Sequence, residues 1–112
     1  MLAVGGPRDA WAPALAAAHG VGIGEFNGAD ATVLSGDAEA LDRIAAGLAG
    51  RRVRHTRLKV SHAFHSALME PMLGEYRRVA ETVHPAVPEL PFFSTVRGRR
   101  LAPGEPLGAD YW

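Results

Sequence analysis

The sequence predicts an α+β fold, with a ferredoxin-like β-α-β-β-α-β unit up to about Val60 and then a helix and a short β extension. Three observations support this prediction. Short apolar runs alternate with amphipathic stretches over residues 1–60, Asn27–Gly28 marks a turn between two of the runs, and the proline-rich stretch "HPAVPELP" separates a later helix from the last apolar runs. Four strands with two helices on one face would bury a small core.

The first strand is expected in the apolar run at residues 1–5, which two glycines end. Pro7 suits the first position of a helix, because the N–H that proline lacks would have no partner there. Three apolar residues then follow at spacings of four and three, which places them on one helix face: Trp11, Leu15 and Ala18. The helix is therefore expected to continue up to about residue 20.

Two short strands are expected over "VGIGEFNG" and "ATVLSG". They would pair as a hairpin across the four residues "NGAD", a longer turn than the tightest, two-residue type. Asp37 and Glu39 then lie where acidic side chains complement the dipole of a second helix. Its amphipathic stripe is formed by Leu41, Ile44, Ala45 and Leu48. Gly50 is expected to end this helix, and "RVRHTRLKV" returns as the fourth strand.

Residues 61–112 are expected to form a second part. Its helix would tolerate Pro71 only near its start. One face of this helix would carry five apolar residues, namely Leu68, Met72, Tyr76, Val79 and Val83. The runs "PFFSTV" and "RRLA" are expected to be two short strands around Gly98.

The composition excludes several classes of function. Apolar residues make up 47% and charged residues 21% of the 112 residues, and twelve basic residues balance twelve acidic ones. Nothing in this balance attracts nucleic acid or an anionic membrane. The absence of cysteine excludes disulfides, thiolate metal sites and a cysteine nucleophile. With no visible signal peptide and no apolar run near the roughly 20 residues of a membrane span, the chain is expected to be cytoplasmic. Its apolar ends, "MLAVGG" and "ADYW", suggest a piece of a larger protein.

The stretch "VSHAFHSALMEPM" contains two histidines three residues apart. The zinc pattern H-E-x-x-H is absent, so a metal site is not favoured. A neutral imidazole can act as a general base near pH 7, but such a base needs a hydroxyl or thiol to activate. None of the four serines lies in the nucleophile pattern G-x-S-x-G: Ser35, Ser61, Ser66 and Ser94. The residues alone therefore indicate either a base without a nucleophile or two structural histidines.

A basic group lies around the fourth expected strand and is formed by Arg51, Arg52, Arg54, Arg57 and Lys59. It is either a solvated strand face or a contact for an anion such as phosphate. Split βαβ folds include RNA-binding domains, but "MLAVG" and "ATVLSG" lack the aromatic residues on which bases would stack.

The segment "VSHAFHSALMEPML" strongly resembles the acyltransferase domains of modular type I polyketide synthases. The resemblance extends over nearly the whole chain, through "NGAD-ATVLSGDAEAL" to "PFFSTVRGRRL" and "ADYW". It implies that residues 1–60 are a ferredoxin-like small subdomain and that residues 61–112 carry the histidine motif, a helix and the return to a larger, α/β hydrolase-like domain.

The resemblance further implies that His65, the last residue of the motif His62-Ala63-Phe64-His65, is the general base. It would activate a serine that attacks the thioester of malonyl-CoA, and the malonyl group would pass to the phosphopantetheine thiol of an acyl carrier protein. No bound cofactor is implied. His62, Ala63 and Phe64 would shape the pocket, with Phe64 crowding the position of an α-methyl group, which disfavours methylmalonyl units. One methyl group typically discriminates by only about 1–3 kcal/mol.

The family's G-H-S-x-G serine, its oxyanion-hole glutamine and its carboxylate-binding arginine have no counterpart among these residues. The partners would thus be the remainder of the acyltransferase domain, the carrier protein and malonyl-CoA, and the chain alone is expected to be inactive. The alternative is a non-catalytic ferredoxin-like module that binds a carrier protein or a small metabolite.

Overall fold

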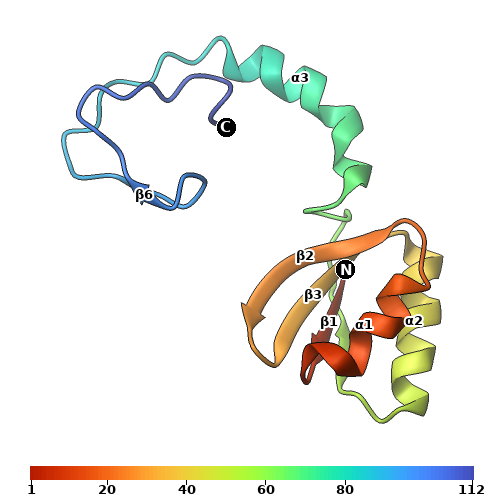
Figure 1. Cartoon of the computed structure of the whole chain (residues 1–112). Helices are drawn as coiled ribbons and strands as arrows, with labels where there is room; N and C mark the ends of the chain where they lie inside the picture. The colour runs from red at the N-terminus through yellow and green to blue at the C-terminus, as the bar shows by residue number, and fades with distance from the viewer. The chain divides into compact units, whose positions relative to one another are not determined.

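The computed structural model describes all residues from Met1 to Trp112. The chain divides into two compact units, Met1–Pro71 and Met72–Trp112 (Figure 1). By its contacts, the histidine segment, defined here as residues 61–66, belongs to the first unit. The division at residue 60, which the resemblance implied for the parent domain, stays a prediction.

The first unit has the element order β-α-β-β-α-β that the sequence predicts. Its elements are β1 (Leu2–Gly5), α1 (Arg8–Ala16), β2 (Val21–Gly28), β3 (Ala31–Gly36), α2 (Ala38–Gly50) and β4 (His55–Arg57). The strands form one sheet in the order β2-β3-β1-β4, with every neighbouring pair antiparallel. Both helices cover the same face of this sheet (Figure 1).

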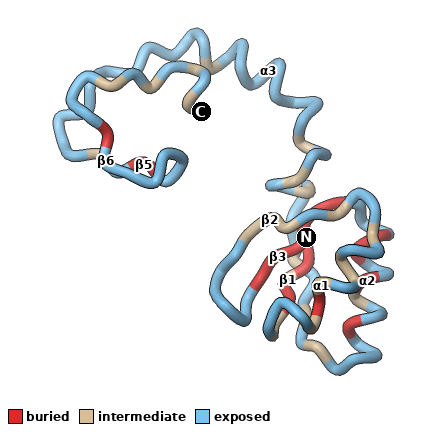
Figure 2. Tube along the Cα trace, viewed as in Figure 1, coloured by how far each residue is buried: buried red, intermediate tan, exposed pale blue.

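The core of the first unit lies between the sheet and the two helices (Figure 2). Alternate residues of β1 and one residue of β3 face this core, because successive side chains of a strand point to opposite faces. The buried cluster consists of Leu2, Val4, Trp11, Leu34, Leu41, Ile44 and Leu48. Full burial of one large apolar side chain contributes about 1.5–3 kcal/mol. The stripe predicted for α2 therefore holds the helix to the sheet.

Four predicted details of the first unit were wrong at element ends. The hairpin loop contains two residues, because Gly28 pairs directly with Ala31, so the turn is tighter than the four-residue turn expected from "NGAD". Pro7 precedes α1 as its N-cap, and that helix ends at Ala16. The fourth strand is limited to β4, because only three of its residues pair with β1.

Helix α2 is capped at both ends. The Asp37 carboxylate accepts a hydrogen bond of 2.8 Å from the Ala40 N–H. At the other end the Val53 N–H donates to the Leu48 carbonyl at 2.9 Å, and Arg52 adopts a φ of 58°. This is the Schellman arrangement. The helix ends at Gly50, as predicted, but the left-handed position falls two residues later, at Arg52, where the chain turns to bring Val53 against the core.

The second unit contains most of α3 (Glu70–Ala80), which follows the 3-10 turn η1 (Ala67–Met69), and the paired strands β5 (Phe93–Ser94) and β6 (Arg99–Arg100). The two predicted strands around Gly98 are confirmed, although each is short. The predicted helix is also confirmed, but it ends before Val83. No residue of α3 is buried within the described chain. None of the helices is long and apolar enough to cross a lipid bilayer.

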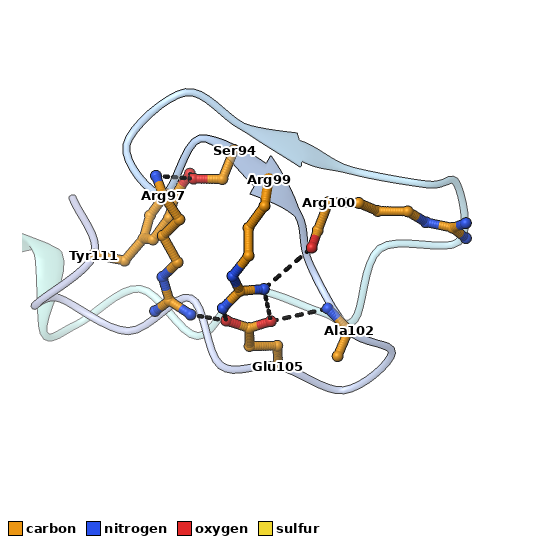
Figure 3. Close-up of polar contacts among 7 residues, drawn as sticks. All are labelled: Ser94, Arg97, Arg99, Arg100, Ala102, Glu105 and Tyr111. Carbon is orange, nitrogen blue, oxygen red and sulfur yellow. Dashed lines mark hydrogen bonds and ion pairs between the residues drawn. The ribbon is translucent and has the colours of Figure 1, made fainter.

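Polar contacts hold the second unit together (Figure 3). The largely buried Glu105 carboxylate accepts hydrogen bonds from Arg97, from Arg99 and, at 2.8 Å, from the Ala102 N–H. The buried Ser94 hydroxyl accepts from the Tyr111 hydroxyl at 2.7 Å. Both groups tie residues around the β5–β6 hairpin to the segment that follows it.

Candidate active site around His65

The histidine segment lies against the β2–β3 hairpin. The Ser35 hydroxyl, near the end of β3, donates a hydrogen bond of 2.5 Å to the carbonyl of Phe64. On β2, a Cβ atom built at Gly24 would lie 3.5 Å from the Cβ of His65. Two neighbouring strands, β2 and β3, therefore contact the turn that contains His65, although both precede it by many residues in the sequence.

His65 presents its side chain to solvent. The side chain is 60% exposed, and its Nε2 lies 3.5 Å from a carboxylate oxygen of Glu25. This distance is longer than a typical direct hydrogen bond. The two groups would form an ion pair only with a protonated imidazole, because a neutral ring carries no charge. The backbone of His65 has a φ of 59°, in the left-handed region that residues other than glycine rarely adopt. An exposed imidazole at a constrained backbone position is suited to exchange protons with a group brought from outside these residues.

The other three residues of the motif precede His65, and the turn itself contains Phe64 and His65. The rings of His62 and Phe64 pack with centroids 5.9 Å apart, and 41% of Phe64 is exposed. The His62 Nδ1 lies 2.9 Å from the Ser61 hydroxyl, and the Ala63 carbonyl accepts a 2.6 Å hydrogen bond from the Ser66 hydroxyl. The two rings therefore form one small aromatic surface within the histidine segment.

The serines do not supply a nucleophile to His65 in this structure. Ser61 and Ser66 bond within the histidine segment, and Ser94 belongs to the second unit. Ser35 is fully buried and directs its hydroxyl to a carbonyl. The structure contains no group of three or more histidine or acidic residues that could hold a metal ion. None of the four serine hydroxyls is hydrogen-bonded to His65.

Sequence reasoning missed three residues of the site, namely Gly24, Glu25 and Ser35. The sequence predicts Ser35 only as a residue of the expected strand "ATVLSG" outside the nucleophile pattern, and it predicts no role for the two residues of β2. One signal was available for Ser35: Leu34 faces the core, so its neighbour must face the other side of the sheet. No local pattern indicates that the histidine segment covers that side.

Comparison with curated proteins finds polyketide synthases. No family model matches the chain. It is 42% identical over 113 residues to polyketide synthase GfsA of Streptomyces halstedii, which covers 100% of this chain and 2% of that protein. It is also 42% identical over 112 residues to the phenolphthiocerol synthesis polyketide synthase type I Pks15/1 of Mycobacterium bovis, of which it covers 5%. The chain thus spans only a small part of these relatives.

Solved structures locate the similarity in one domain. The acyltransferase domain from the second module of the salinomycin polyketide synthase is 38% identical with a TM-score of 0.76, over 99% of this chain and 26% of that one. A loading acyltransferase from the avermectin modular polyketide synthase is 28% identical with a TM-score of 0.81, over 99% of this chain and 36% of that one.

The α+β fold and the sequence around the exposed histidine place this chain among acyltransferase domains. More specifically, the chain belongs to the acyltransferase domains of polyketide synthases, of which it covers one segment. This confirms the resemblance drawn from the histidine motif.

Proposed function

We propose that this segment supplies the general base, His65, of a polyketide synthase acyltransferase that moves a malonyl unit from CoA to an acyl carrier protein. One observation carries the proposal: in a chain of this family, the last histidine of the motif is exposed and held at a left-handed backbone position against the β2–β3 hairpin. The peptide before this residue is bound by the hairpin, while its imidazole remains exposed to solvent.

In the proposed mechanism the His65 imidazole takes the proton of a serine hydroxyl while the serine oxygen attacks the thioester carbonyl. The CoA thiolate leaves and takes up the proton from the imidazolium, which leaves malonyl-serine. In the second half the phosphopantetheine thiol gives its proton to His65 and attacks the acyl-serine, and the serine oxygen then regains a proton. The serine would come from the remainder of the acyltransferase domain, because none of the four serines here is presented to His65.

Each part of the chain would have a place in the parent domain. Residues 1–60, with the sheet order β2-β3-β1-β4, would be the ferredoxin-like small subdomain. Residues 61–112 would carry the histidine motif and α3 and return to a larger α/β hydrolase-like domain. The exposed apolar side chains of α3 support this, since an isolated surface seldom carries so many: Met72, Leu73, Tyr76 and Val79. The chain alone would then be inactive. The cytoplasmic location expected from the sequence stays a prediction.

The malonyl preference would come from the aromatic surface next to His65. Phe64 packs against His62, so its ring is supported where a smaller side chain would leave space. An α-methyl group on the extender unit would meet this ring. The expected discrimination corresponds to about 1–3 kcal/mol, so the preference need not be absolute.

The test of the base replaces His65 in the full-length parent enzyme. His65→Asn removes the base but keeps a residue that tolerates a positive φ, whereas His65→Ala removes both. Both variants should load malonyl units about 10²- to 10⁴-fold more slowly, as is typical for loss of a general base. The far-UV circular dichroism spectrum and the melting temperature of His65→Asn should match the wild type. The intact mass of the carrier protein measures loading. If His65→Asn loaded malonyl units at the wild-type rate, the proposal would be wrong.

A further inference from the structure

Ser35 is fully buried although it lies on the face of β3 opposite the helices. Its neighbour Leu34 packs into the core between the sheet and the helices, so the side chain of Ser35 points to the other face. That face would be open in a four-stranded sheet covered on one side only. Ser35 has an exposure of 0% because the histidine segment lies over it, and its hydroxyl donates to the Phe64 carbonyl at 2.5 Å.

The carbonyl that Ser35 holds belongs to the peptide directly before His65. Only two residues other than glycine have a positive φ in the chain, Arg52 and His65. Arg52 is explained by the bonds that close helix α2. His65 follows no helix, so another contact must offset the cost of its left-handed backbone. The bond from Ser35 is a long-range hydrogen bond to this peptide.

Gly24 makes room for the same contact. The pairing of β2 with β3 shifts between Ile23 and Glu25, so Gly24 is the extra residue of a bulge. A Cβ atom there would lie 3.2 Å from the Cβ of Ser35 and 3.5 Å from that of His65. The missing side chain of Gly24 therefore lets the Cβ of His65 approach the hairpin closely. The residue that follows Gly24, Glu25, lies beside the imidazole.

We propose that Ser35 is a positioning residue for His65: its hydroxyl holds the Phe64 carbonyl, which fixes the left-handed backbone and hence the direction of the imidazole. This inference rests on the proposed role of His65 as the base. It differs from a purely structural role, in which the hydroxyl would stabilise the fold without affecting the reaction.

The test uses Ser35→Ala and Ser35→Thr in the full-length parent enzyme. Loss of the hydroxyl should lower kcat for malonyl loading about tenfold and leave KM for malonyl-CoA within about twofold, because the base is misdirected while the substrate still binds. Ser35→Thr keeps the hydroxyl and should restore most of kcat. Thr32→Val is the matched control, since it removes another buried hydroxyl from β3 on the face that carries Leu34. Its kcat should equal that of the wild type.

A second measurement is independent of activity. Histidine-labelled enzyme should show a shifted backbone NMR signal for His65 in Ser35→Ala and an unshifted one in Thr32→Val, with the signal assigned from its absence in His65→Asn. A kcat no lower than that of Thr32→Val, or a His65 signal that does not move, overturns the positioning role. Full loading by His65→Asn would instead show that the proposed function fails, and the NMR signal alone would then decide whether Ser35 holds this backbone.

Discussion

Phe64 and His65 are neighbours in the sequence, yet they make different contacts in the structure. The carbonyl of Phe64 is bound from behind by Ser35, while its ring packs on His62. The imidazole of His65 stays exposed beside Glu25. Because both exposed side chains of this ion pair are well solvated, the pair itself contributes little to stability, typically under about 1 kcal/mol. Under the proposed function, the reaction would depend on how the backbone of His65 is held.

Phe64→Ser should relax the choice of extender unit, because the smaller side chain leaves space for an α-methyl group. The ratio of malonyl to methylmalonyl loading should fall by about 10-fold or more, in line with the effect of one methyl group in a pocket. The measurement is competition between the two CoA thioesters in the full-length enzyme, followed by mass spectrometry of the carrier protein. Phe26→Ser is the control, since Phe26 is an exposed residue of β2 outside the histidine motif, and its ratio should not change. An unchanged ratio in Phe64→Ser would exclude the steric explanation.

Helix α2 shows how one element supports the site from a distance. Its apolar stripe packs against the strands that carry the core, and its N-cap follows directly after the end of β3, close to Ser35. The cap therefore helps to define where β3 ends. Both ends of the helix are closed by specific hydrogen bonds, at Asp37 and at Val53. Frayed ends would allow the adjoining strands to move.

Asp37→Ala should destabilise the first unit by about 1 kcal/mol, because the Ala40 N–H would lose its partner. Asp42→Ala on the same helix is the control. It removes an exposed ion pair with Arg57, so its cost should stay below about 0.5 kcal/mol. Urea unfolding of the parent acyltransferase domain measures both changes. Equal effects of the two substitutions would contradict the role of Asp37 as a cap.

At the scale of the whole chain, the two units differ in what holds them. The first unit has an apolar core of seven buried residues, whereas the second relies on Glu105, Ser94 and their hydrogen-bond partners. In addition, Arg77 donates to Glu81 and to Asp110, and the bond with Glu81, followed by the charge of Asp110, raises the pKa of Arg77 above its usual value. The exposed apolar side chains of α3 have no partner in such a unit.

The isolated chain should not be acylated by malonyl-CoA, because none of its serines is presented to His65. Its intact mass should remain that of the unmodified 11.9 kDa protein after incubation. The full-length enzyme, treated in the same way, should gain one malonyl group. An adduct on the isolated chain would mean that a group within these residues acts as a nucleophile.

The sequence by itself determined the order of the elements, the buried face of α2 and the motif that carries the family resemblance. These features are encoded locally, in the spacing of apolar residues and in short motifs. Only the tertiary structure decided that Ser35 bonds to the Phe64 carbonyl, that Gly24 forms a bulge and that Arg52 and His65 adopt positive φ values. The physical reason is that such contacts depend on strand register and on the path of a distant segment across the sheet, which no local pattern contains.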